Sequence, residues 1–184
     1  MIIYQSEFIV QVPIQYAFEY LSQPYNLFDI MNNSWHTYQF EGEEPTKDQK
    51  VQVGDCFKVL IVDKKIYMYC DLILTKIAQN SKIEYKYAYK AIKMREKHIG
   101  SKLLESSILQ SQNKIDNHDT WTFRSKDKQN VVITYTSELR GTISFLKRIE
   151  LYGVKLLLKI ITKKALKRIS SDMRDNFDLK NKQK

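Results

Sequence analysis

The sequence predicts a single α+β domain with an antiparallel sheet of about seven strands, two short helices after the first strand and one long C-terminal helix. Three observations support this fold class. Stretches rich in Val, Ile, Tyr and Phe alternate with short polar breaks through most of the chain. Pro13 begins a pair of short segments with helical spacing. Residues 144–177 have the periodicity of one long amphipathic helix.

The composition is that of one ordinary soluble domain. The chain has 184 residues, of which 43% are hydrophobic, and only five are glycine. This apolar content supports a core and excludes a disordered or repeat architecture. No stretch approaches the roughly 20 apolar residues of a membrane span. Lys155 and Lys159, for example, interrupt the apolar segment 154–161.

Turn-forming residues separate the expected strands, which we place at residues 2–12, 35–40, 53–62, 66–77, 83–91, 119–124 and 130–139. The two short helices are expected at residues 13–21 and 24–31, and residues 41–52 form a polar connection. Residues 92–117 are left undecided, because residues 102–112 fit either a continued strand or a short helix. The long helix is expected at residues 144–177, with a polar tail at 178–184.

Alternation within one expected strand separates its tyrosines from its charges. Tyr85, Tyr87 and Tyr89 share the side that we expect to face the core, and Lys86 and Lys90 lie on the opposite side. Rings and cations on opposite faces would not meet one strand of nucleic acid together. The sequence therefore disfavours nucleic-acid binding.

The residues that usually carry catalysis or bind metals form no recognisable constellation. His36, His98 and His118 lie in three separate segments, and Cys56 and Cys70 have neither metal-ligand nor disulfide-framework spacing. The five glycines are too scattered for a phosphate-binding loop. The sequence therefore predicts no metal site, no cofactor and no catalytic residues. Two cysteines of this kind indicate a reducing, intracellular compartment.

The positive charge is concentrated near the C-terminus. The whole chain has 30 Lys and Arg against 21 Asp and Glu. Residues 1–146 hold 18 and 17 of these, which leaves 12 and 4 for residues 147–184. A nucleic-acid-binding protein usually spreads its cations over a binding face, so this distribution draws attention to the terminal helix instead.

The expected terminal helix has two chemically different sides. Apolar residues form one stripe, comprising Val154, Leu158, Ile161, Ala165 and Ile169, and lysines form the opposite row, comprising Lys155, Lys159, Lys163 and Lys167. Lys164 and Arg168 flank this lysine row, and no Asp or Glu between Leu151 and Ser171 is present to pair with these cations. The row fits a solvated face, and it also predicts salt-sensitive contact with an anionic membrane or an acidic protein surface.

Three short motifs accompany this order of elements: residues 8–21 (FIVQVPIQYAFEYL), residues 53–57 (VGDCF) and residues 119–123 (DTWTF). Together they resemble the START-like, helix-grip superfamily, which includes polyketide cyclase/dehydrase and lipid-transport proteins, coenzyme Q-binding START proteins and plant pollen allergens. The resemblance implies that residues 1–177 form one START-like domain whose sheet curves around the C-terminal helix and leaves a cavity for an apolar ligand. The stretch 93–117 is longer than the usual connection between neighbouring strands in this superfamily.

We therefore predict non-catalytic binding or transfer of a lipid or another hydrophobic small molecule in that cavity. Aromatic rings with phenol groups suit an amphipathic ligand, and the same rings would also fill a dry core. The expected wall residues are Phe18, Phe57, Tyr85, Tyr87, Trp121, Tyr135, Leu158 and Ile161.

Two other functions fit the same sequence. In one, the domain is an accessory or structural subunit of a larger assembly, with its basic helix docked on an acidic partner. In the other, it is a cyclase- or dehydratase-like enzyme, for which the sequence names no acid or base. The chain begins with a strand instead of an Arg- and Ser-rich transit segment, so we expect a cytoplasmic, soluble or peripheral protein rather than a mitochondrial one.

Overall fold

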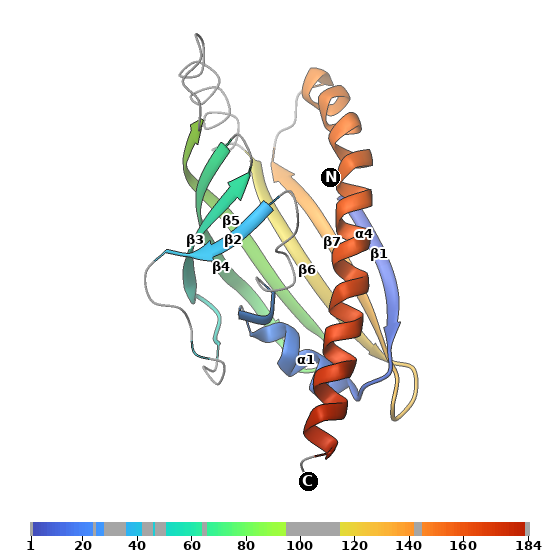
Figure 1. Cartoon of the computed structure of the whole chain (residues 1–184). Helices are drawn as coiled ribbons and strands as arrows, with labels where there is room; N and C mark the ends of the chain where they lie inside the picture. Colours follow the sequence, from blue (N-terminus) through green and yellow to red (C-terminus); the bar gives the residue numbers. More distant parts are fainter. Residues whose placement is uncertain are drawn as a thin grey trace.

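The computed structural model of the chain is a curved sheet with a long helix and a short helix packed on one side (Figure 1). The structure describes residues 2–23, 25–27, 36–41, 46, 51–63, 66–94, 115–141 and 145–182. Within these ranges, the backbone alone is described for residues 3, 36–38, 63, 66, 89, 91, 92, 94, 115, 141 and 145–162.

Seven strands in the described ranges form one antiparallel sheet in the order β1-β7-β6-β5-β4-β3-β2. They are β1 (Ile2–Val10), β2 (His36–Phe40), β3 (Cys56–Asp63), β4 (Ile66–Ala78), β5 (Lys82–Met94), β6 (Ile115–Ser125) and β7 (Val131–Gly141). Strands β2 to β7 follow one another as a meander, and β1 crosses over to pair with β7. The predicted α+β fold class is confirmed.

The pleat of the strands separates an inner face, which the helices cover, from an outer face. On β1, Tyr4 and Val10 are buried, whereas Gln5 and Glu7 are exposed. The same alternation buries Tyr85 and its inner-face neighbours on β5, as the sequence predicts. The side chain of Tyr89 lies outside the described residues. The core is therefore built from alternate residues of the strands.

Local backbone features decide where β3 begins. The strand starts three residues later than expected, because Gln52 to Asp55 form a tight turn in which the Asp55 amide donates to the Gln52 carbonyl over 3.1 Å. Gly54 occupies the third position of this turn with a φ of 99°, which is a conformation that favours glycine. The VGDCF motif is thus a turn that leads into a strand.

A β-bulge in β4 brings a hydroxyl to the outer face. Leu74 pairs with Tyr85 and Lys76 pairs with Glu84, so Thr75 is an extra residue between two successive pairs. Its hydroxyl Oγ1 lies 3.1 Å from Oε1 of Glu84. Bulges increase local bending and twist, and this one contributes to the curvature of the sheet.

The short helix α1 (Ile14–Ser22) follows Pro13 and is fixed to the inner face. It buries Ala17, Phe18 and Leu21, which recur at the spacing of one helix face. Residues 25–27 are also helical, and the remainder of the second expected helix lies outside the described residues. Residues 92–94 and 115–117 of the undecided stretch end β5 and begin β6, and residues 95–114 lie outside the described residues.

The long helix α4 (Phe145–Lys182) runs beside β1 and passes α1 near its C-terminal end (Figure 1). It extends five residues beyond the expected boundary at 177. Its described buried residues are Leu166, Ile169 and Met173, whereas Ala165 is only half-buried. The contact face is thus rotated from the predicted stripe toward Leu166 and Met173. The side chains of Val154, Leu158 and Ile161 lie outside the described residues.

None of the described helices is both long enough and apolar enough to cross a membrane.

Candidate functional site

Six of the eight predicted cavity residues have described side chains, and all six are buried. They lie on α1, β3, β5, β6 and β7, with exposed fractions of 1–8%: Phe18, Phe57, Tyr85, Tyr87, Trp121 and Tyr135. The structure thus brings together, in one core, aromatic residues from distant parts of the chain. Leu158 and Ile161 lie in α4, and their side chains are outside the described residues.

Ring contacts join several of these side chains. The ring centroids of Trp121 and Tyr135 are 4.5 Å apart, and that of Tyr4 is 6.1 Å from that of Tyr135. Phe18 meets Phe123 edge-on at 5.5 Å. Tilted and edge-on pairs at these separations are favourable for aromatic rings. This part of the inner face is therefore well packed.

Tyr85 connects the sheet to α1. Its hydroxyl donates to the backbone carbonyl of Ser22 over 3.1 Å, at the last turn of the helix. Burial raises the pKa of the Tyr85 phenol above its ordinary value, so the group is a neutral hydrogen-bond donor.

Asp119 lies among these aromatic residues, although it is not one of the wall residues expected from the sequence. It pairs directly with Tyr85 on one side and with Ser137 on the other, so the three residues share the inner face. Asp119 is only 7% exposed. Its Oδ1 atom is buried and has no hydrogen-bond partner among the described residues.

Two opposing effects act on the Asp119 carboxyl. Burial raises its pKa above the ordinary value, and hydrogen bonds with the side chains of Ser137, Tyr135 and Tyr87 counter part of this effect. No described cation forms an ion pair with the carboxyl. Within the part of the chain that the structure describes, the inner face thus contains an acid that has hydroxyl neighbours and no cationic partner.

A sequence signal for this residue does exist. In the motif DTWTF, Asp119 alternates with Trp121 and Phe123, which are both large and apolar. Strand alternation therefore places a carboxyl on the core side of β6, where a charged residue is rare unless it has a partner or a function.

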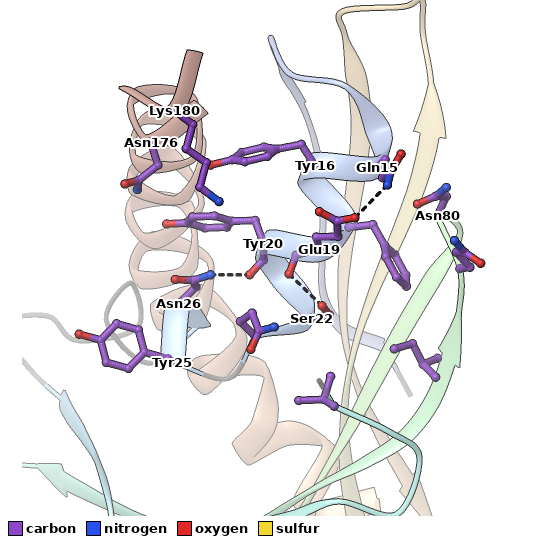
Figure 2. Close-up of a pocket in the computed structure, with 15 residues that line it drawn as sticks. Gln15, Tyr16, Glu19, Tyr20, Ser22, Tyr25, Asn26, Asn80, Asn176 and Lys180 are labelled. Atoms are coloured by element: carbon purple, nitrogen blue, oxygen red, sulfur yellow. Dashed lines mark hydrogen bonds between the residues drawn. The ribbon is translucent and has the colours of Figure 1, made fainter. Parts of the chain in front are cut away.

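A pocket of about 1120 Å³ lies beside α1 (Figure 2). The C-terminal end of α4 and the turn between β4 and β5 contribute to its walls, which are polar and aromatic. The lining includes Tyr16, Glu19, Tyr20, Asn80 and Lys180. Of the predicted cavity residues, Phe18 also lines this pocket, as does Ser22, the partner of Tyr85. No sequence pattern predicts a pocket at this end of the fold.

The described residues contain no group of three or more acidic, His or Cys side chains that could hold a metal ion. Cys70 is buried, and burial raises the pKa of its thiol to about 12, so it is not an activated nucleophile. Cys56 is exposed, and its pKa is also raised, by partial burial and by Asp71.

Lys163 and Lys167 of the predicted lysine row are exposed on α4, as are Lys164 and Arg168. The expectation that these cations have no acidic partner is wrong for Arg168. Its Nε lies 3.7 Å from Oδ2 of Asp172, one turn later on the same helix. The stretch without acidic residues, 151–171, ends one residue before this partner. The side chains of Lys155 and Lys159 lie outside the described residues.

Comparisons with known proteins identify the fold. No protein-family model matches the sequence, and no curated protein is significantly similar to it. Solved structures do match over most of the chain. A protein from Arthrobacter aurescens is 12% identical, with a TM-score of 0.60 over 93% of this chain and 85% of that one. A protein from Chromobacterium violaceum is 9% identical, with a TM-score of 0.58 over 93% of this chain and 96% of that one.

Norcoclaurine synthase from Thalictrum flavum, solved in complex with dopamine and hydroxybenzaldehyde, has the same architecture. It is 13% identical, with a TM-score of 0.54, and the match covers 91% of this chain and 83% of the synthase. Similarity at this level shows the fold alone. The chain has the START-like helix-grip fold, which confirms the resemblance seen in the sequence.

Proposed function

We propose that this protein binds a lipid or another hydrophobic small molecule between the sheet and the C-terminal helix, without catalysing a reaction on it. The observation that carries the proposal is the inner face itself. Side chains from five elements gather there into an aromatic surface that the helices cover, and Tyr85, Tyr87 and Tyr135 add phenol groups to it. Such a surface offers apolar area together with a few hydrogen-bonding groups, as small-molecule sites do.

The fold supports the same proposal. Norcoclaurine synthase of this architecture was solved with two small aromatic molecules in complex. Leu158 and Ile161 lie on α4 upstream of the described contact at Leu166, and we place the helix side of the ligand site there.

The first test is mass spectrometry of organic extracts from the purified protein. We expect an apolar compound at a substantial fraction of one molecule per chain. Its absence from protein purified without detergent would count against the proposal.

A second test uses the two tryptophans of the chain, Trp35 and Trp121. In a Trp35→Phe variant, fluorescence reports on the inner face alone, because Trp121 is buried there. Addition of the extracted compound to delipidated protein should change this fluorescence in a saturable way. The double variant Trp35→Phe, Trp121→Phe is the blank and should show no saturable change in tryptophan fluorescence.

The exposed cations of α4 favour a second activity, docking on an acidic surface. Lys163, Lys164 and Lys167 project into solvent from consecutive turns. Each cation near an anionic membrane contributes about 1 kcal/mol, and the attraction falls as salt screens it. We propose that Lys155, Lys159, Lys163 and Lys167 form this contact, with anionic lipid or an acidic protein as the partner.

The tight packing of the described inner face favours one competing function, that of an accessory subunit whose interior is filled by side chains. Native size in lysate distinguishes the two. A free species of the 21.9 kDa chain supports the carrier, and stable comigration with a large complex supports the subunit.

A further inference from the structure

The sheet buries two carboxyls in adjacent residue pairs, and the two differ in their hydrogen-bond and ion-pair partners. Glu84 pairs with Thr120, and the next pair along the two strands is Tyr85 with Asp119. Because side chains alternate, Glu84 lies on the outer face and Asp119 on the inner face. Both are only 7% exposed.

Glu84 has several donors on its side of the sheet. Oε1 lies 3.0 Å from Nη1 of Arg140, and Oε2 lies 3.0 Å from Nζ of Lys82. Thr75 adds a hydroxyl from the bulge in β4. A buried carboxylate with this many charged and polar partners needs nothing further.

No cation with a described side chain forms an ion pair with Asp119. Its neighbours across the strands, Tyr85 and Ser137, are neutral, and the hydroxyl of Tyr85 is directed to the Ser22 carbonyl. The remaining hydroxyl contacts leave Oδ1 without a donor among the described residues. A buried acceptor in this state costs roughly 1–3 kcal/mol, and more when it is charged. Among the described residues, Asp119 thus holds an unused hydrogen-bond acceptor inside the core.

The surroundings of Asp119 determine which ligand group would fit. Trp121 and Tyr85 supply ring surface next to the carboxyl, so the body of the ligand is apolar. The free Oδ1 requires a donor. A hydroxyl supplies one hydrogen at a lower desolvation cost than an ionised amine, which would have to leave water as a full charge.

We infer that Asp119 is the polar anchor of the internal site and that it selects hydrophobic ligands carrying a hydroxyl group, which donates to Oδ1. This inference rests on the proposed function, because it requires a ligand on the inner face. It adds the chemical class of that ligand and the residue that recognises it.

The test compares two probes of nearly equal shape, 2-naphthol and 2-methylnaphthalene, on delipidated full-length protein. A hydrogen bond to the Asp119 carboxyl predicts roughly three- to hundredfold tighter binding of 2-naphthol, the range for neutral and charged acceptors together. In Asp119→Leu, which replaces the carboxyl by an apolar group of similar size, the two affinities should become equal within about twofold. Binding of 2-methylnaphthalene should be unchanged or stronger.

A second variant keeps the test valid if Asp119→Leu fails to fold. If Asp119→Leu does not give a cooperative thermal transition, Asp119→Asn replaces it, since Asn keeps the shape and cannot ionise. It should lose most of the preference for 2-naphthol. An exposed control, Asp127→Asn at the β6–β7 turn, should bind both probes as the parent does.

The outcomes separate the two proposals. If the parent binds both probes equally and Asp119→Leu changes neither affinity, the anchor is wrong and the binding function stands. If neither probe binds, the compound extracted from the protein takes their place. A compound without a hydroxyl, or equal recovery from Asp119→Leu and the parent, overturns the anchor. Failure of the probes together with empty extracts overturns the binding function and the anchor with it.

Discussion

Arg140 on β7 reaches over β6 to form a two-pronged contact with Glu84 on β5. Nη1 lies 3.0 Å from Oε1 and Nη2 lies 3.2 Å from Oε2. The same Nη1 lies 3.2 Å from Nδ1 of His118, which is on the strand between them. Because a guanidinium can only donate, Nδ1 is the acceptor in this contact. One side chain therefore joins three adjacent strands on the outer face.

Burial and the Arg140 charge lower the pKa of His118, and Glu84 opposes them. The ring is therefore neutral near pH 7. Nδ1 of His118 lies 3.3 Å from Oε1 of Glu84. Nη1 of Arg140 contacts both of these acceptor atoms.

Removal of this guanidinium should destabilise the fold. Arg140→Gln leaves Glu84 buried with Lys82 and Thr75, and we expect a loss of about 1–2 kcal/mol. The estimate is below the range for fully buried pairs because the Arg140 side chain is 42% exposed. Urea unfolding at pH 7 measures the loss. The matched control is Arg124→Gln at an exposed position near the end of β6, which should cost less than about 0.5 kcal/mol.

Glu84 should make the protein sensitive to acid. Burial alone would raise its pKa, but hydrogen bonds and charge from Arg140 and Lys82 outweigh burial and hold the pKa at about 2. A depressed folded-state pKa gives stability that is present above the ordinary value and is lost as the pH falls toward 2. The free energy of unfolding of Glu84→Gln should lie below that of the parent at pH 7, and the two should converge near pH 2. Parallel curves would contradict this assignment.

Asp119 should change the pH dependence of stability in the opposite direction to Glu84. Its pKa is raised in the folded state, so the folded protein holds this proton more tightly than the unfolded chain does. That contribution to stability is greatest at low pH and is lost as the pH rises through the raised value. Asp119→Asn removes this effect. The free energy of unfolding of the variant, relative to that of the parent, should therefore increase as the pH rises from 3 to 8. Two-dimensional NMR of labelled Asp carboxyls measures the titration directly.

The lysine row should control contact with acidic surfaces. Changing Lys155, Lys159, Lys163 and Lys167 to Gln should weaken binding to vesicles of anionic phospholipid at least roughly tenfold at low salt. The thermal transition should not change. The control variant carries the same charge loss elsewhere, at the exposed residues Lys58, Lys76, Lys126 and Lys128. Equal binding by both variants would show that net charge, and not this helix face, determines the contact.

Blocking the internal site from the helix side should expel the ligand. Leu158→Trp adds volume at a predicted wall position, and overpacking by about 1–3 kcal/mol corresponds to roughly 5- to 150-fold weaker binding. Mass spectrometry of extracts should recover correspondingly less compound. Lys163→Trp adds the same side chain at an exposed position of α4 and should leave recovery unchanged.

The sequence predicted the fold well because strand alternation and helix periodicity are local patterns. The inward positions of Tyr85 and Tyr87 followed from alternation alone. The rotation of the α4 contact face did not follow from the helix periodicity alone. With 3.6 residues per turn, Leu166 and Ala165 flank Ile169 on opposite sides, and the packing of α4 against β1 and α1 decides which side is buried.

The candidate site was only partly predictable, since its polar groups depend on contacts between distant residues. Alternation placed Glu84 on the outer face, but its burial depends on Arg140, 56 positions later. The unused oxygen of Asp119 is visible only when the neighbours of β6 are known. The pocket beside α1 combines residues from both ends of the chain.

The pairing of β1 with β7 determines the order in which the sheet is completed during synthesis. Phe8 pairs with Ile133, so β1 cannot pair until about 125 further residues of the chain have been synthesised. At roughly 5–20 residues per second, a ribosome takes about 6–25 seconds to make that stretch. Throughout this interval Tyr4, Phe8 and Val10 lack the strand that later shelters them, and an unpaired apolar strand is prone to associate with other chains. The nascent N-terminus is therefore the segment for which a chaperone that binds extended apolar peptides has the longest opportunity.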